Sequence, residues 1–309
     1  MALIALVPLD GTKLSESAYS MLPFVSQLGI DRVRLVSVWE SAAEESESGK
    51  GESELGEVTE KGRAYLEAYL TQQAEDVKAM GFEVETVVKI GRPADEILEA
   101  TQDVDIIVIA THGRSGIARW WLGSIADQVI KESACPCLVI GPNVETDLAH
   151  FEIKRVLLPL DGSENAEQAL PLAAFICDKT GATLDIVRAM SLTAVSYDPG
   201  MSMYSADLIT SMEDSVKAYL QGVSERLGSR KVETTMLMGG PGEMLLEHLK
   251  TKPADLVVST THGRTGVTRA ALGSTSDRLL HGTAPVLIFH PGDEEPGDIV
   301  DAARVAVGI

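Results

Sequence analysis

A chain of 309 residues has room for two domains of ordinary size. Apolar residues make up 45% of it and charged residues 23%, so each half can bury a core of its own. The 46 acidic residues against 26 basic ones give a formal net charge of −20, which argues against nucleic acid or an anionic membrane as the main partner.

The amino terminus and the cysteines indicate the compartment. No basic segment precedes the first apolar run, which stops at Asp10, and no run approaches the roughly 18 residues of a membrane span, so we expect neither a signal peptide nor a membrane anchor. Cys135, Cys137 and Cys177 form no Cys-x-x-Cys pair, and an odd number suits no closed disulfide framework. We therefore expect buried, reduced thiols in a cytoplasmic protein.

The first half alternates between apolar strands and amphipathic helices. We expect strands at Leu3–Leu9, Val33–Val38, Glu83–Ile90, Asp105–Ala110 and Cys137–Ile140. Helices are expected at about Ser15–Leu28, from the end of an acidic run at Glu60 to about Met80, from Ala94, and near Ser124–Lys131. The fourth strand is continuous and β-branched, as in strands buried on both faces. This alternation predicts an α/β fold with a doubly wound, Rossmann-like parallel sheet of five strands.

Two segments stand outside this alternation. Ser41–Glu60 is rich in Ser, Glu and Gly and poor in apolar residues, so it predicts a solvated loop. The counterpart in the second half, Leu192–Asp207, carries methionines and tyrosines instead. That composition fits a loop that folds over a site and a disordered excursion equally well.

The second half repeats the first. Thr111-His112-Gly113-Arg114 returns as Thr261-His262-Gly263-Arg264, and the later Leu-Gly-Ser and the early Pro-Leu-Asp-Gly also return at almost the same spacing. A period this long is a duplicated domain rather than a solenoid repeat. We expect domain 1 at 1–145, domain 2 at 152–292 and a tail at 293–309 with a short helix at Ala302–Val307.

Two features should meet at one crevice in each copy. Open α/β sheets bind ligands at the carboxyl ends of their strands, where the strand order reverses. Asp10 and Asp161 end the first strands, and the glycine motifs leave the fourth strands after Ala110 and Thr260. The aspartates are suited to accept hydrogen bonds from ribose hydroxyls.

The glycine motif makes physical sense as a phosphate cradle. Gly113 lets the backbone approach a ligand without a Cβ in the way. Gly123 and Ser124 open a helix, whose free N–H groups and dipole favour an anion. Arg114 and Arg119, with Arg264 and Arg269 in the second copy, add positive charge. The competing interpretation is that the glycines serve turns and the serines cap helices, and the repeat alone shows only duplication.

Other motifs are absent or uninformative. The chain has no Gly-x-x-x-x-Gly-Lys-Ser/Thr and no Gly-x-Gly-x-x-Gly after the first strand. His112 and His262 have no nucleophile nearby in sequence, so a hydrolytic triad is unsupported and a structural role is expected. Trp120-Trp121 becomes Ala270-Ala271 in the second copy, which fits either core packing or a partner surface.

These motifs together resemble the universal stress protein family over both halves, up to about Gly292. The family's ATP-binding members carry Gly-x-x-Gly, nine residues, then Gly-Ser/Thr. The last two glycines and the serine match in both copies, whereas the first glycine is Ala110 in one copy and Thr260 in the other. Threonine is β-branched and larger, so the resemblance implies ATP binding in the first copy and leaves the second in doubt.

The resemblance also implies an architecture and a set of site residues. The fold would be that of the adenine nucleotide alpha hydrolases, with strand order 3-2-1-4-5 and pairing through the fifth strands, either as a pseudo-dimer within the chain or as a homodimer. The predicted nucleotide-binding residues of the first copy are Pro8, Asp10, Val38, Ala110, His112, Gly113, Arg114, Gly123, Ser124 and Ile125. Those of the second copy are Asp161, Ala189, Thr260, Gly263, Arg264, Gly273, Ser274 and Thr275. No catalytic or metal-binding residue is predicted.

Three functions remain in competition. The first is an ATP-binding stress sensor or regulator with an unknown protein partner. The nucleotide can bind with or without Mg²⁺, and hydrolysis is slow at most because no general base is evident. The second is a nucleotide-free interaction scaffold of the same fold. The third is an adenylating enzyme, which ranks last because the turn after Asp10 lacks a Ser-Gly-Gly pyrophosphate loop.

Overall fold

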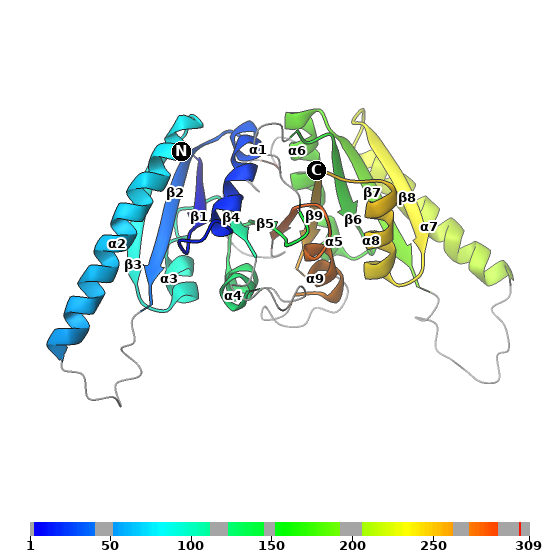
Figure 1. The fold of residues 1–309 in the computed structure, drawn as a ribbon. Coiled ribbons are helices and arrows are strands. Elements are labelled where there is room, and N and C mark those ends of the chain that lie inside the picture. The colour runs from blue at the N-terminus through cyan, green and yellow to red at the C-terminus, as the bar shows by residue number, and fades with distance from the viewer. Residues whose placement is uncertain are drawn as a thin grey trace, which may run out of the picture. The chain divides into compact units, whose positions relative to one another are not determined.

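The computed structural model describes residues 3–40, 52–111, 123–144, 152–191, 206–261, 272–289 and 303. The chain divides into two compact units (Figure 1). Unit 1 includes Met1–Phe151 and unit 2 includes Glu152–Gly292. Each unit holds one copy of the repeat. Of the predicted tail helix only Ala303 is described, and it is helical and buried.

Unit 1 is a parallel sheet with helices between its strands (Figure 1). Its strands are β1 (Leu3–Pro8), β2 (Ile30–Trp39), β3 (Glu83–Ile90), β4 (Ile106–Ala110) and β5 (Cys137–Ile140). They pair in the order β3-β2-β1-β4-β5. The connecting elements are the 3₁₀ helix η1 (Ser15–Met21), α1 (Leu22–Gln27), α2 (Glu52–Ala79), α3 (Pro93–Glu99) and α4 (Ser124–Glu132).

Unit 2 repeats this topology. Its strands are β6 (Arg155–Pro159), β7 (Thr183–Met190), β8 (Val232–Met238), β9 (Leu256–Thr260) and β10 (Val286–Phe289), all parallel. Their order is β8-β7-β6-β9-β10. The helices are α5 (Glu164–Glu167), α6 (Leu170–Thr180), α7 (Ala206–Arg226), α8 (Pro241–Thr251) and α9 (Ser274–Leu280). The α/β class and the strand order 3-2-1-4-5 are therefore confirmed in each unit. Pairing through the fifth strands stays a prediction.

The first and fourth strands of each unit separate toward their carboxyl ends. In unit 1, β1 pairs with β4 only at Ala5–Ile106 and Leu6–Ile107, whereas it pairs with β2 as far as Pro8. Unit 2 shows the same short ladder between β6 and β9. Because the connections leave these two strands toward opposite sides, the separation opens a crevice at the predicted place.

Two expectations about helices are wrong in detail. Helix α2 begins at Glu52, inside the expected loop Ser41–Glu60, because glutamates are favourable near a helix start and no proline interrupts them. The helix expected at Ser15–Leu28 is a 3₁₀ segment followed by α1, whose second residue is Pro23. Proline has no amide hydrogen to continue a preceding helix, so a new helix starts there. Of Leu192–Asp207, residues 192–205 lie outside the described part.

Candidate functional site

A cavity of about 740 Å³ lies at the carboxyl ends of the unit 1 strands. The ends of β1, β2 and β4 line it, together with the start of α4 and parts of α2 and α3. It brings together seven predicted site residues: Pro8, Asp10, Val38, Ala110, Gly123, Ser124 and Ile125. The other three, His112, Gly113 and Arg114, lie outside the described residues.

Asp10 both shapes the turn after β1 and faces the cavity. Its Oδ1 accepts hydrogen bonds from the amide of Thr12 at 3.0 Å and from the Thr12 hydroxyl at 2.6 Å. Gly11 between them has φ +80°, a conformation that L residues other than glycine rarely adopt. The turn therefore holds a carboxylate at the crevice, where it can accept hydrogen bonds from the hydroxyls of a ligand.

The start of α4 presents backbone donors to the same cavity. Gly123 is the N-cap and has no side chain with which to accept from the first-turn amides. Among the residues that the structure describes, none lies within 4 Å of a Cβ placed on Gly123. Ser124 and Ile125 are exposed and line the cavity. This arrangement suits an anionic group.

Among the lining residues that the sequence analysis did not predict are Trp39, Glu40 and Tyr65. Trp39 ends β2, and a Cβ on Gly62 of α2 would overlap its indole, so the helix can cover the ring only because residue 62 is glycine. Tyr65 on the same helix is 65% exposed. The signal that could have found Trp39 is its place directly after Val38, at the end of the second strand.

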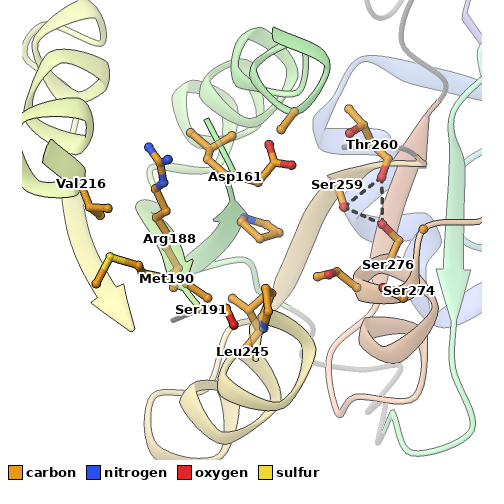
Figure 2. Close-up of a pocket in the computed structure, with 18 of the residues that line it drawn as sticks. Asp161, Arg188, Met190, Ser191, Val216, Leu245, Ser259, Thr260, Ser274 and Ser276 are labelled. Atoms are coloured by element: carbon orange, nitrogen blue, oxygen red, sulfur yellow. Dashed lines mark hydrogen bonds between the residues drawn. The ribbon is translucent and has the colours of Figure 1, made fainter. Parts of the chain in front are cut away.

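Unit 2 has a cavity of about 710 Å³ at the equivalent place (Figure 2). Six predicted residues line it: Asp161, Ala189, Thr260, Gly273, Ser274 and Thr275. Gly263 and Arg264 lie outside the described residues. Asp161 holds its turn as Asp10 does, accepting from the amide of Ser163 at 2.9 Å and from its hydroxyl at 2.6 Å.

The two cavities differ where the last helix begins. The amide of Gly273 donates to the carbonyl of Thr261 at 2.8 Å, and a Cβ on Gly273 would lie 2.9 Å from that oxygen. The hydroxyl of Ser276 donates to the carbonyl of Thr260 at 2.9 Å and lies 3.2 Å from the Ser259 hydroxyl (Figure 2). These contacts tie the start of α9 to the end of β9.

Arg188 on β7 also lines the unit 2 cavity and was not predicted. Its Cζ lies 4.4 Å from the centre of the Tyr219 ring on α7. Burial raises the pKa of Tyr219, so the ring stays neutral beneath the guanidinium. The sequence signal for Arg188 is a basic residue between the apolar Val187 and Ala189, near the end of a strand.

Three further observations concern metal ions, thiols and membranes. Within the described ranges no cluster of three or more His, Cys, Asp or Glu side chains could hold a metal ion. Cys135, Cys137 and Cys177 are free and buried, as expected. Among the helices that the structure describes, none is long and apolar enough to cross a membrane.

Comparison with known proteins settles the family. The sequence model described as the universal stress protein family matches residues 1–141 and again 152–290. The chain belongs to the universal stress protein family. Its two matches make it a tandem member, as the repeat predicted.

Individual relatives agree with this assignment. A universal stress protein of Mycobacterium tuberculosis is 30% identical over 199 residues, which is 63% of this universal stress protein and 65% of the relative. The chain thus spans less than two thirds of that relative's length. A universal stress protein of Methanocaldococcus jannaschii is 36% identical over 92 residues, covering 29% of this chain and 54% of the relative.

A solved structure shares the fold of the whole tandem chain. The crystal structure of a universal stress protein from Archaeoglobus fulgidus superposes with a TM-score of 0.67 at 23% identity. The match covers 94% of this chain and 97% of that one. At this identity the likeness speaks for the fold alone.

Proposed function

We propose that this universal stress protein binds an adenine nucleotide, ATP above all, in the unit 1 cavity and acts as a nucleotide-dependent sensor or regulator in a stress response. One observation carries the proposal. A carboxylate at Asp10, an open helix start at Gly123 and a strand end at Val38 converge on one cavity. Its volume of about 740 Å³ is in the range of ~300–1,000 Å³ that is usual for small-molecule sites.

The lining residues offer the hydrogen-bond donors, acceptors and aromatic surface that a nucleotide requires. The amides that start α4 would hold phosphate oxygens, and Ser124 can donate its hydroxyl to them. Asp10 would accept from ribose hydroxyls, and the backbone of Val38 would meet the base, with Trp39 and Tyr65 offering aromatic surface nearby. Ala110 adds only a methyl group where the family motif has its first glycine.

The second site is proposed to be weaker for ATP. Thr260 replaces the first motif glycine, and α9 is held back against β9 by the contacts of Ser276 and Gly273. Any hydrolysis is proposed to be slow, since the sequence motif itself supplies no general base. The buried free thiols agree with the cytoplasm as the proposed compartment.

Calorimetry with a cavity-filling variant tests the proposal. Gly123→Val adds a side chain at a lining position where a Cβ meets no described residue within 4 Å. ATP affinity should therefore fall about tenfold or more, which corresponds to about 1.4 kcal/mol. The control Gly222→Val changes an exposed position of α7, where a Cβ meets no described residue within 4 Å, and should leave binding unchanged. Gly273→Val should reduce the total ATP binding of the chain by less than Gly123→Val does. Unchanged ATP affinity in both cavity variants would overturn the assignment of the phosphate site, and a parent chain that binds no ATP would leave the nucleotide-free scaffold as the better account.

Assembly through the fifth strands is proposed on the family resemblance. β5 and β10 are the edge strands of their respective units, and each is fully buried. A homodimer would sediment at twice the mass of 33.0 kDa, whereas pairing within the chain leaves a monomer. Sedimentation at several concentrations distinguishes the two.

A further inference from the structure

The cavities of the two units differ most at one position of the second strand. The amide of Leu9 donates to the carbonyl of Val36 at 2.8 Å, and the amide of Leu160 donates to that of Val187 at 2.9 Å. The two hydrogen bonds are equivalent, so they show which residue of unit 1 corresponds to which residue of unit 2. The next residue is therefore Ser37 in unit 1 and Arg188 in unit 2.

Ser37 contributes nothing to its cavity. It is buried, and its hydroxyl donates to the carbonyl of Leu9 at 2.7 Å. Beside it, a Cβ on Gly11 would meet nothing within 4 Å, and the cavity extends along this turn to Thr12 and Ser15. Unit 1 thus keeps open space next to the Asp10 turn.

Arg188 fills the corresponding space in unit 2 with a positive charge. A Cβ on Gly162 would lie 2.8–2.9 Å from three atoms of its guanidinium, and Gly162 has φ +83°. The Tyr219 ring supports the guanidinium from the side of α7. Figure 2 shows Arg188 and Asp161 extending to the same side of the cavity. The guanidinium therefore has a defined place at the wall of the site.

This difference changes the net charge of the lining. Among the described lining residues, unit 1 has two carboxylates, Asp10 and Glu40, and no basic side chain. Unit 2 balances Asp161 with Arg188 and has Ser191 where unit 1 has Glu40. The glycine motif does not offset the difference, because its arginines are the same in both copies of the sequence.

Resting on the proposed nucleotide binding, we propose that the unit 2 cavity accepts a nucleoside polyphosphate as the free anion, with Arg188 as its counter-charge. The unit 1 cavity accepts the same ligand only as its complex with a divalent cation. The reason is electrostatic: a polyphosphate that enters a cavity lined by two carboxylates is repelled unless a cation comes with it. An arginine fixed in the wall supplies this charge permanently.

The test requires full-length chains in which only one of the two cavities can bind the nucleotide. Ser124→Glu and Ser274→Glu add a negative charge at equivalent exposed helix starts, which closes one cavity to phosphate and suits the helix dipole. ATP binding is then measured by calorimetry with Mg²⁺ and with EDTA. The Ser274→Glu chain, which reports unit 1, should lose about tenfold or more of its affinity in EDTA, and the Ser124→Glu chain less than about threefold.

Substitution of Arg188 assigns the effect to its charge. In the Ser124→Glu background, Arg188→Met keeps a long side chain on the Tyr219 ring and should weaken ATP binding in EDTA by about tenfold. Arg188→Lys should restore most of it. Arg226→Met removes another arginine of unit 2, one that pairs with Glu167 outside the cavity lining, and should change nothing.

The reciprocal change is made in unit 1. In the Ser274→Glu background, Glu40→Ser copies the unit 2 residue and should reduce the loss caused by EDTA. Equal losses in EDTA at both cavities, or an Arg188→Met chain that binds ATP without metal as the parent does, would overturn the inference while leaving nucleotide binding intact. Absence of ATP binding in every chain, with and without Mg²⁺, would instead overturn the proposed function.

Discussion

Two glycines at the same motif position have different surroundings. A Cβ on Gly123 would meet no described residue within 4 Å, whereas one on Gly273 would lie 2.9 Å from the carbonyl oxygen of Thr261. A sequence comparison counts both as matches to one motif. Their different contacts follow from how the helix start docks on the fourth strand, and the motif does not encode this docking.

The cysteines allow a prediction at the residue scale. Burial raises the pKa of Cys135 to about 11 and that of Cys177 to about 12, and it raises the pKa of Cys137 well above its ordinary value. Only the thiolate is reactive, so the native thiols should be inert to a disulfide reagent at mildly alkaline pH. All three should react after unfolding in guanidinium. Rapid reaction of any thiol in the folded chain would contradict this account.

At the scale of elements, a buried ion cluster distinguishes the second strands of the two units. Asp185 on β7 is fully buried and lies 3.0 Å from His248 Nε2 and 2.9 Å from Lys252 Nζ, both on or next to α8. In unit 1 the equivalent position is Arg34, whose guanidinium donates to Asp103 at 2.9 Å. The duplicated strand has exchanged the sign of the charge together with its partners.

Loss of the buried carboxylate should be costly. Asp185→Asn removes the buried charge that accepts from Arg155 and Lys252, and the loss of such charged hydrogen bonds costs about 1.5–3 kcal/mol of unfolding free energy, since both cations keep Glu233 as a partner. The control Asp178→Asn removes a half-exposed partner of Arg230 and should cost less than about 1 kcal/mol. Urea unfolding of both variants measures the difference. Equal costs would show that the cluster does not stabilise unit 2.

Glu233 adds a dependence on pH at the edge of this cluster. Hydrogen bonds from Arg155 and then Lys252 lower the pKa of Glu233 from 4.5 to about 2. A carboxylate with a lowered pKa stabilises the fold at pH values above its pKa in the unfolded chain. This contribution is lost as the pH falls from about 4.5 toward about 2. Because the side chain is half exposed, solvent screening leaves about 1 kcal/mol at neutral pH.

Glu233→Gln should therefore be less stable than the parent at neutral pH and equally stable in acid. Urea unfolding of both chains across this pH range measures the difference in unfolding free energy. A difference that stays constant down to the acid end of the series would show that ionisation of Glu233 is not its source.

The bounds of the strands and helices show which features the sequence predicts correctly. Strands β3 and β5 have the predicted bounds because apolar runs end there at Gly91 and Gly141. Helix α2 begins earlier than predicted, since composition alone does not separate an acidic helix from an acidic loop. Trp39, Tyr65 and Arg188 were missed for another reason: which side chains line a cavity depends on where α2 and α7 pack, and no local pattern records this packing.

At the scale of the whole molecule, duplication gave two cavities of similar size and different chemistry. The repeated motif correctly indicated one crevice per unit, because the strand order and the separation of the first and fourth strands follow from the α/β alternation itself. The inequality of the two cavities was predicted only through Thr260. The larger differences lie at Glu40 and Arg188, outside the motif.

Native mass spectrometry of the full chain equilibrated with ATP and Mg²⁺ tests the central claim most directly. The account predicts a bound adenine nucleotide that is lost or strongly reduced in Gly123→Val and retained in the control Gly222→Val. A chain that takes up no nucleotide, or one whose bound nucleotide is unaffected by Gly123→Val, would contradict the assignment of the unit 1 cavity.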